Sequence, residues 1–376
     1  MRILIVNEYL PDSDRGEITG GVEAYCHYVG RQLRTEHEVQ FLSRSTTGSV
    51  WDAPTLASLP GRLWFLLRAL VQGLRADADV VMGTTYVVHP IAWLIGTLRR
   101  RPVVFWYPDV LIGSWRNGQF GAVEGIMGEL AERLIMRLPV ARFIAISEST
   151  AAKLVAHGVD PGRVTVVPCG YDPATVDDVE PEPTDRRRIT VVGRAVPYKR
   201  LDVVLRAAAR LAPAMPDLEV VVIGQGPELE PLGKLATDLG IAHQVDFRGF
   251  LDEHRQVLAA VAGSRAFASA SEIEGFGIVV VEAMALGVPY VVTDIPAFRE
   301  VTAGGVGGAL VPPGDDEAMA VELRALLEPG PARDEIVRNG REHASRYTWT
   351  SVADATAAVL TDVVASRRRR PSGRLR

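Results

Sequence analysis

Short runs of β-branched and apolar residues alternate with longer amphipathic stretches along most of the chain. This alternation is typical of βαβ units, which build a mostly parallel sheet with helices on its faces. We expect six strands in the first half and six in the second, at residues 3–6, 39–42, 80–82, 103–106, 143–146, 164–167, 189–192, 219–223, 245–247, 266–268, 290–292 and 308–311. The pattern therefore predicts an α/β protein built from two similar halves.

A proline-rich, acidic stretch separates the two halves. Between Pro168 and Pro183 the chain loses its periodic pattern and gathers Pro, Asp and Glu, a composition typical of a linker. We predict four parts: a first Rossmann-like domain over residues 1–170, a second over 171–348, a final helix over 349–366 and a basic tail over 367–376. We expect the tail to be disordered, with contact to acidic lipid or to a partner as the alternative.

Two apolar segments raise the question of a membrane. Residues 80–98 carry no formal charge over a length that would span a bilayer, but Gly83, His89 and Pro90 interrupt them, so we expect a strand, a loop and a helix. The helix before this segment has an apolar face that we expect to pack on the core, and the alternative is that residues 61–68 lie on a membrane surface. The members of this face are Leu63, Leu66, Leu67, Leu70 and Val71.

Composition narrows the class of protein. Of 376 residues, 47% are hydrophobic and 23% are charged, values that exclude a disordered or fibrous chain. The net charge of −5 supplies no basic field for holding nucleic acid, so we expect no nucleic-acid partner. Two cysteines, Cys26 and Cys169, are too few for a disulfide framework or a metal cluster, and we expect them to be packing residues of a cytoplasmic protein.

The segment from residue 271 to residue 289 carries the most chemical information. It follows a predicted strand with a glycine-containing loop, and we expect an apolar helix that begins near Gly277 and ends at Gly287. Backbone N–H groups at a helix start favour a phosphate. Glu282 interrupts the apolar helix and needs a partner, for which the two hydroxyls of a ribose are suited; solvent or an Arg at a helix edge is the alternative. Glu274 lies in the loop just before this helix.

A second group of residues follows the strand predicted at 189–192. Ligands bind at the carboxyl ends of strands in open α/β sheets, and Gly193 lets the backbone come close to one. Arg194 offers a fork for phosphate oxygens and Lys199 adds a compact positive charge. We therefore expect these residues to lie beside the Glu274 loop.

In this order along the chain, the motifs resemble those of the family-4 retaining glycosyltransferases, which have the GT-B fold. The resemblance covers nearly the whole chain and implies two Rossmann-like domains facing a central cleft, with the last helix returning to the first domain. It rests on Gly20-Gly21-Val22-Glu23, residues 166–172, Gly193-Arg194 with Lys199, residues 223–227, residues 245–249, and the pair Glu274 and Glu282.

The resemblance also implies a reaction. The protein is expected to move a sugar, with retention, from a nucleotide-diphosphate donor to a hydroxyl acceptor: a lipid-linked intermediate, a polysaccharide precursor or a small metabolite. Front-face attack is the usual proposal, with the departing phosphate taking the acceptor's proton. Fixed cations and helix amides replace a metal, so neither metal nor cofactor is expected. A peripheral contact with the inner face of the membrane is compatible with this assignment.

Site roles follow from the resemblance residue by residue. Two cations would hold the diphosphate, one acid the donor ribose, and a second acid with the following amides the sugar and phosphate. Two glycines after the first strand would allow close approach, and the backbone at residues 250–251 would contact the base. The two cations are Arg194 and Lys199, and the acid for the ribose is Glu282. The acid for the sugar and phosphate is Glu274, followed by the amides of Gly275, Phe276, Gly277 and Ile278. The two glycines are Gly20 and Gly21, and the backbone at the base is that of Phe250 and Leu251.

The chain departs from the family pattern after the fourth strand. Many members have a His followed by Asp there, and here Pro108 stands in place of the His, followed by Asp109. Asp109 is expected either to bind the sugar or acceptor or to cap a turn. His89 is a weaker substitute for the missing His, and we expect it to pack or cap instead. The pair Asp77 and Asp79 has a metal-binding spacing but precedes a strand, which favours a turn.

Two other functions stay open from the sequence alone. A nucleotide-sugar isomerase or epimerase of related fold would bind the same donor without an acceptor. A non-catalytic nucleotide-sugar binding protein is the second alternative, because Pro108 replaces the usual His.

Overall fold

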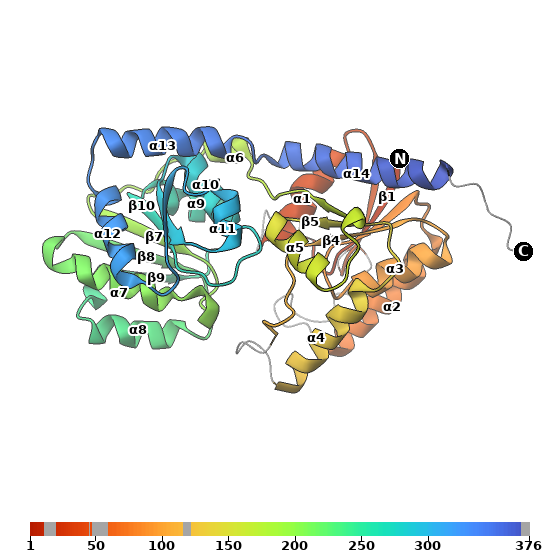
Figure 1. Ribbon diagram of the computed structural model, residues 1–376, viewed down its shortest axis with the longest axis horizontal. Coiled ribbons are helices and arrows are strands. Elements are labelled where there is room, and N and C mark those ends of the chain that lie inside the picture. The colour runs from red at the N-terminus through yellow and green to blue at the C-terminus, as the bar shows by residue number, and fades with distance from the viewer. Residues whose placement is uncertain (11–19, 45, 47–58, 116–121, 370–376) are drawn as a thin grey trace, which may run out of the picture. The chain divides into compact units, whose positions relative to one another are not determined.

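The computed structural model describes residues 1–10, 20–44, 46, 59–115 and 122–369, and these form two compact units (Figure 1). The N-terminal unit contains the described residues up to Cys169 together with the last helix, and the C-terminal unit runs from Gly170 to Thr348. Each unit has one six-stranded sheet in which every pairing is parallel. The predicted α/β fold with two similar halves is confirmed.

The sheet of the N-terminal unit has the strand order β2-β1-β3-β4-β5-β6. Its central strands are almost wholly apolar, as expected for parallel strands buried on both faces. All six predicted positions are strands: β1 (Arg2–Val6), β2 (Glu38–Leu42), β3 (Val80–Gly83), β4 (Val103–Tyr107), β5 (Arg142–Ala145) and β6 (Val164–Val166). Residues 80–98 divide into β3 and a helix, as predicted.

Helices cover both faces of this sheet. On one face Tyr25 of α1 stacks on Trp106 of β4 with ring centroids 4.2 Å apart, and its hydroxyl lies 3.1 Å from that of Thr356 in α14. On the other face Phe65 of α2 joins Phe105 of β4 in one apolar cluster. The helices of this unit are α1 (Gly21–Leu33), α2 (Leu59–Arg75), α3 (His89–Leu98), α4 (Ala122–Met136), α5 (Glu148–Ala156) and α14 (Trp349–Arg369).

Two expectations for this unit need correction. Helix α14 continues to Arg369, so residues 367–369 of the predicted disordered tail are helical, and the rest of the tail lies outside the described residues. Leu66 and Leu70 pack on the core as expected, beside the fully buried Phe65 and Ala69, whereas Leu63, Leu67 and Val71 are 59%, 53% and 42% exposed. Since the apolar side of α2 is wider than the face that packs on the core, spacing alone did not single out its buried members.

The sheet of the C-terminal unit has the order β12-β11-β10-β7-β8-β9. Its six strands again match the predicted positions. They are β7 (Arg187–Val192), β8 (Leu218–Ile223), β9 (Val245–Gly249), β10 (Ala266–Ser269), β11 (Tyr290–Thr293) and β12 (Gly308–Val311).

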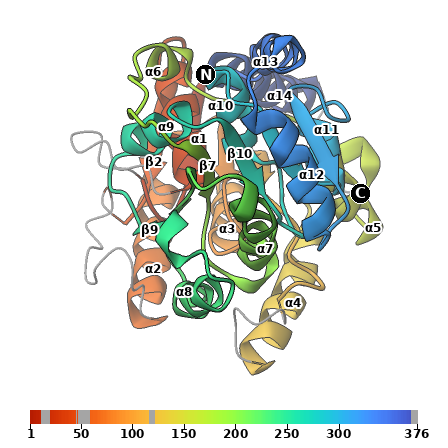
Figure 2. The same cartoon turned by 90° about the vertical axis from the view of Figure 1, so that its left-hand side faces the viewer.

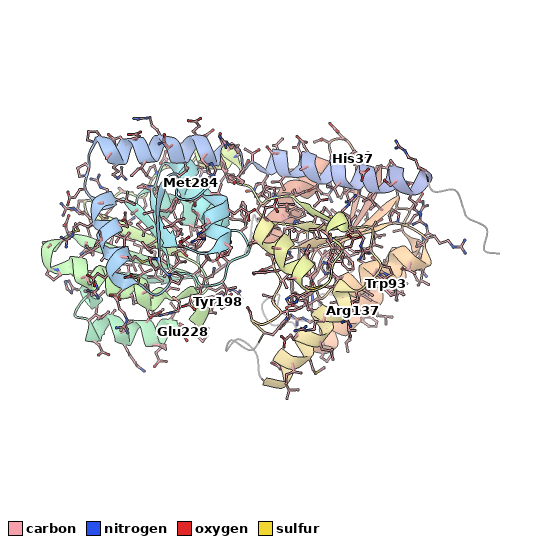
Figure 3. All side chains as sticks on the ribbon, viewed as in Figure 1. His37, Trp93, Arg137, Tyr198, Glu228 and Met284 are labelled. Carbon is pink, nitrogen blue, oxygen red and sulfur yellow. The ribbon has the colours of Figure 1, made fainter. Side chains whose placement is uncertain are left out.

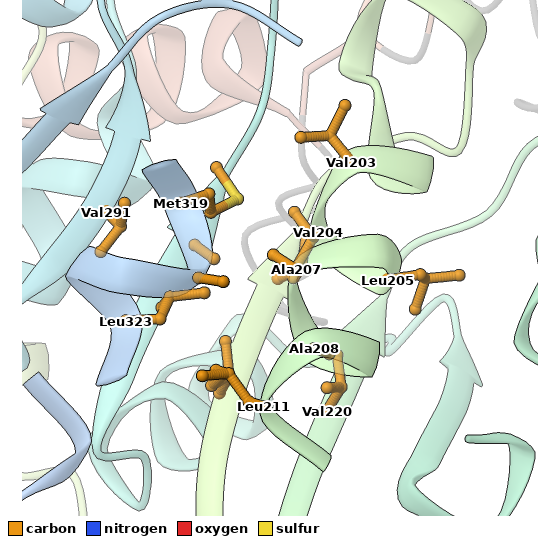
Figure 4. Close-up of a cluster of buried hydrophobic side chains, with 14 of the residues drawn as sticks. Val203, Val204, Leu205, Ala207, Ala208, Leu211, Val220, Val291, Met319 and Leu323 are labelled. Atoms are coloured by element: carbon orange, nitrogen blue, oxygen red, sulfur yellow. The ribbon is translucent and has the colours of Figure 1, made fainter. Parts of the chain in front are cut away.

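Helices also cover both faces of this second sheet (Figure 2). Figure 4 shows one side, where Ala207 of α7 and Leu323 of α12 pack with Val220 of β8. The neighbouring Val221 points to the other face and packs with Val257 of α9, as strand alternation requires. The helices are α6 (Pro173–Asp177), α7 (Leu201–Leu211), α8 (Leu229–Asp238), α9 (His254–Ala262), α10 (Ile278–Leu286), α11 (Pro296–Val301), α12 (Asp316–Leu327) and α13 (Pro331–Ala344).

Candidate functional site

The strand order of the C-terminal unit creates a switch point beside β7. The chain goes from β7 to β8 and β9 on one side of the sheet, and then to β10 on the other side of β7. Loops that leave β7 and β10 therefore diverge at their carboxyl ends, where ligands bind in open α/β sheets. Residues 193–199 follow β7 and residues 270–277 follow β10. The two groups of residues singled out from the sequence thus flank one switch point.

The loop after β7 packs closely on the loop after β8. Gly193 and Gly224 have φ of +153° and +136°, and a Cβ on Gly224 would lie 2.0 Å from the carbonyl oxygen of Gly193. The amide of Ala195 donates to the carbonyl oxygen of Gln225 at 2.9 Å. Only glycine allows both the backbone angles and this approach. The glycines therefore fix the path of the loop that carries Arg194.

The loops after β7 and β10 meet through a backbone bond and an ion pair. The amide of Glu272 donates to the carbonyl oxygen of Tyr198 at 2.9 Å, and the Lys199 ammonium donates to the carboxylate of Glu274. Both side chains of this pair are about one-fifth exposed, at 19% and 21%. The exposed Arg194 donates to the Tyr198 hydroxyl at 2.6 Å. Tyr198, labelled in Figure 3, thus contacts both loops.

Helix α10 begins directly after this ion pair. Gly277 precedes it with φ of +100°, and a Cβ there would lie 2.8 Å from the Phe298 ring, so glycine is required. The first amides of a helix lack partners within the helix and carry partial positive charge. The side chain of Phe276 is buried against Tyr347, with ring centroids 5.6 Å apart. Phe276 can therefore contribute only its backbone to a ligand.

Glu282 is the fifth residue of α10 and is only 5% exposed. Its Oε1 lies 2.8 Å from Nε2 of His254, the first residue of α9. Attraction by Glu282 raises the pKa of His254 above its ordinary value. The sequence indicated that Glu282 needs a partner but did not identify His254, since nothing in the sequence shows that the start of α9 packs on α10.

The segment expected to contact the base lies between β9 and α9. Leu251 packs with the apolar cluster formed by Val221, Ile223 and Val257, whereas Phe250 is 41% exposed. The side chain of Leu251 is therefore engaged inside the unit, and its backbone is the part that remains for a ligand.

The remaining candidates belong to the N-terminal unit. Gly20 and Gly21 lie at the start of α1, where the Gly20 carbonyl oxygen accepts from the Ala24 amide at 2.9 Å. Asp109 accepts from the Val110 amide at 2.7 Å and from the Lys153 ammonium at 2.8 Å. These bonds give Asp109 a structural role in the connection after β4. Contacts of these residues with donor or acceptor stay predictions.

His89 and the pair Asp77 and Asp79 have structural roles in this unit. His89 is fully buried, its ring stacks on Phe105 with centroids 4.1 Å apart, and burial lowers its pKa to about 3. Its expected packing role is confirmed. Both aspartates pair with Arg2, whose backbone amide donates to Asp79 at 2.9 Å. These bonds hold the pKa of Asp79 below its ordinary value, and both aspartates lie in the short connection between α2 and β3.

Two family models together match most of the chain. The model described as Glycosyltransferase Family 4 matches residues 19–175, and the one described as Glycosyl transferases group 1 matches residues 174–343. A D-inositol 3-phosphate glycosyltransferase of Mycolicibacterium smegmatis is 30% identical over 93% of this chain and 88% of its own length. The chain belongs to the family-4 glycosyltransferases.

Further comparisons agree with membership of this glycosyltransferase family. A phosphatidyl-myo-inositol mannosyltransferase of the same organism is 34% identical over 61% of this chain and 58% of its own length. The crystal structure of Anabaena Alr3699/HepE in complex with UDP-glucose superimposes with a TM-score of 0.76 at 19% identity, covering 96% of this chain and 100% of that one. The fold is GT-B, and the protein is a glycosyltransferase rather than an isomerase or a non-catalytic binding protein.

Proposed function

We propose that this glycosyltransferase moves a sugar with retention from a nucleoside-diphosphate donor to a hydroxyl acceptor, without a metal ion. The observation that carries the proposal is the contact between Lys199 and Glu274, with Arg194 in the same loop and the start of α10 directly after Glu274. These groups bring two cations and a helix N-terminus to one switch point. Such a set suits a diphosphate.

The donor is assigned to the C-terminal unit. Arg194 and Lys199 hold the diphosphate, and Glu274 with the amides at residues 275–278 holds the sugar and its phosphate. Glu282 binds the ribose, and the backbone at residues 250–251 contacts the base. The UDP-glucose complex of the similarly folded Anabaena protein supports a nucleotide-sugar donor and makes UDP-glucose the first to test.

Front-face attack accounts for retention without a protein nucleophile. The bond between the anomeric carbon and the phosphate oxygen breaks, and the acceptor oxygen forms its bond to the same face of that carbon. The acceptor's proton moves to the departing phosphate oxygen. Negative charge grows on the diphosphate as it leaves, so fixed groups such as Lys199, Arg194 and the α10 amides stabilise the transition state. These protein charges are the support for a metal-independent reaction.

The acceptor is assigned to the N-terminal unit. The two relatives above are named for transfer to inositol phosphate and to phosphatidylinositol, which supports a polyol or a lipid headgroup carrying hydroxyls as the acceptor. Asp109 is the candidate from this unit for contact with the sugar or the acceptor. Its Oδ1 already accepts from Lys153, so we assign the substrate contact to the same carboxylate with that bond kept.

We also propose a cytoplasmic protein that contacts the inner face of the membrane through α2. Cys26 and Cys169 are free and buried, which suits a reducing compartment. Helix α2 has no acidic residue, exposes Leu63, Leu67 and Val71, and carries Arg75 in its last turn. A basic helix with exposed apolar side chains favours an anionic lipid surface. No helix among the described residues is long and apolar enough to cross a membrane.

The proposal is tested first by donor binding and then by the stereochemistry of the product. A thermal-shift screen with UDP-, GDP-, ADP- and dTDP-sugars should show one base that raises the unfolding midpoint, because a ligand of the native state stabilises it by mass action. With that donor and a polyol acceptor, NMR should show a new glycosidic bond with the donor's anomeric configuration. An inverted product would overturn the retaining assignment.

The variant Glu274→Gln separates binding from transfer. It keeps the size of the side chain but removes the charge that contacts Lys199. We expect transfer to fall by at least about tenfold, equal to about 1.4 kcal/mol in the barrier, while thermal unfolding stays close to that of the wild type. Unchanged transfer would remove Glu274 from the proposed site.

A further inference from the structure

Glu282 is a charged residue in the middle of an apolar helix. Between Ile278 and Leu286 every other residue is Ile, Val, Ala, Met or Leu. Its side chain is only 7% exposed. A buried carboxylate is costly unless charged or polar groups compensate it, so the groups around Glu282 decide which way its carboxylate points.

His254 compensates one of the two carboxylate oxygens. Its Nε2 lies 2.8 Å from Oε1 of Glu282, and the attraction raises the pKa of the imidazole, which favours an imidazolium donating to a carboxylate. Such charge-assisted bonds are stronger than neutral ones. The neighbouring Arg255 is already paired with Asp178 at 2.7 Å. His254 is therefore the group that holds this oxygen of Glu282.

The other carboxylate oxygen of Glu282, Oε2, lacks the kind of partner among the described residues that Oε1 has. Oε2 is buried and has no hydrogen-bond partner within the part of the chain that the structure describes. An ionised carboxylate oxygen is an acceptor only, so its natural partner is a donor such as a hydroxyl group. The His254 bond occupies Oε1, so Oε2 is the oxygen left to accept from a ligand.

We propose that His254 is a positioning residue that holds the Glu282 carboxylate so that Oε2 accepts hydrogen bonds from the donor ribose. The inference rests on the proposed function, because it specifies how the ribose part of that site is built. His254 also begins α9 three residues after Leu251. The segment assigned to the base and the residue that orients Glu282 are therefore close neighbours in the chain. His254 itself does not contact the ribose in this arrangement.

The test compares each protein with ribose-containing and ribose-lacking ligands. UDP, GDP and ADP are each compared with their 2′,3′-dideoxy forms by calorimetry, and the base that the wild type binds most tightly is used for the variants. His254→Ala should weaken binding of the ribonucleotide about tenfold, equal to about 1.4 kcal/mol, and leave binding of the dideoxynucleotide unchanged. His254→Gln, which keeps an N–H donor, should recover part of the loss. The exposed His243, outside this pair, gives the matched control His243→Ala, which should change neither affinity.

Unchanged dideoxynucleotide binding also shows that His254→Ala still folds into a competent site. Equal weakening of both ligands would overturn the positioning role, as would no weakening of either. If the wild type does not distinguish the two ligands, or Glu282→Gln keeps the distinction, the ribose assignment fails while the diphosphate site stands. If the wild type binds none of these three nucleotides and does not bind dTDP, the proposed function fails as well.

Discussion

The ammonium group of Lys199 donates to the carboxylate of Glu274, although 75 positions separate them in the chain. The contact follows from topology, because β7 and β10 are parallel neighbours and both residues lie in loops at their carboxyl ends. An ammonium group has three N–H donors, so Lys199 can keep this bond and still donate to a phosphate. The pair is therefore compatible with an occupied diphosphate site.

Removing the cations of this site should weaken nucleotide binding. We expect Lys199→Ala and Arg194→Ala each to cost about 1.5 to 3 kcal/mol, the range for a hydrogen bond to a charged group. Calorimetric titration with the nucleoside diphosphate of the best donor measures the loss. Lys234→Ala is the matched control, since Lys234 forms an exposed pair with Glu230 within α8. If both site variants bind as the wild type does, the diphosphate lies elsewhere.

Local patterns predicted the strands and the start of α10 because these depend on short-range features. Apolar runs mark parallel strands, and Gly277 marks a helix start whose backbone angle excludes other residues. The bond between His254 and Glu282 was not predictable in this way, because it depends on how α9 and α10 pack on the sheet. The buried face of α2 was predicted only in part for a related reason. Leu66 and Leu70 pack on the core as expected, but tertiary contacts bury Phe65 and Ala69 more deeply and leave Leu63, Leu67 and Val71 exposed.

Removal of divalent metal should leave transfer intact. The proposed site neutralises the leaving diphosphate with Arg194, Lys199 and the first amides of α10, so the protein supplies the positive charge that Mg²⁺ supplies elsewhere. We expect the initial rate in EDTA to match the untreated rate within about twofold, a difference of about 0.4 kcal/mol in the barrier. A loss of activity that added Mg²⁺ restores would contradict the metal-independent mechanism.

The buried His89 should make the N-terminal unit less stable as the pH falls. Its folded-state pKa of about 3 is below the ordinary value of about 6.5, so below pH 6.5 the unfolded chain binds a proton that the folded chain does not. This contribution to stability is complete above pH 6.5 and is lost progressively as the pH falls toward 3. Between pH 7 and pH 5 the loss is about 2 kcal/mol.

A comparison of variants isolates this contribution from the titration of carboxyl groups. His89→Gln cannot take up the proton, so its free energy of unfolding should fall by about 2 kcal/mol less than that of the wild type between pH 7 and pH 5. Denaturant unfolding at the two pH values measures this difference. His157→Gln, at an exposed position of the same unit, should keep the wild-type pH dependence. An equal pH dependence in His89→Gln and the wild type would show that His89 does not cause it.

Helix α2 should bind vesicles that contain anionic lipid. Leu63 and Leu67 can enter the boundary between headgroups and acyl chains, where burial of one such side chain contributes up to about 1.5 to 3 kcal/mol. An arginine near an anionic surface adds about 1 kcal/mol, and Arg75 is exposed at the end of the helix. The protein should therefore co-sediment with vesicles of phosphatidylcholine mixed with phosphatidylglycerol, less with phosphatidylcholine alone, and less as salt is raised.

Charge substitutions on exposed apolar residues separate this surface from nonspecific adhesion. Leu63→Glu and Leu67→Glu should each reduce the bound fraction several-fold, because each removes an apolar contact and adds repulsion from the lipid. Val321→Glu places the same charge on α12 of the C-terminal unit, where Val321 is 61% exposed, and should bind as the wild type does. A chain ending at Arg369 removes the basic residues after the last described helix. If that truncation abolishes binding and the α2 variants do not, the tail is the membrane contact and the assignment to α2 is wrong.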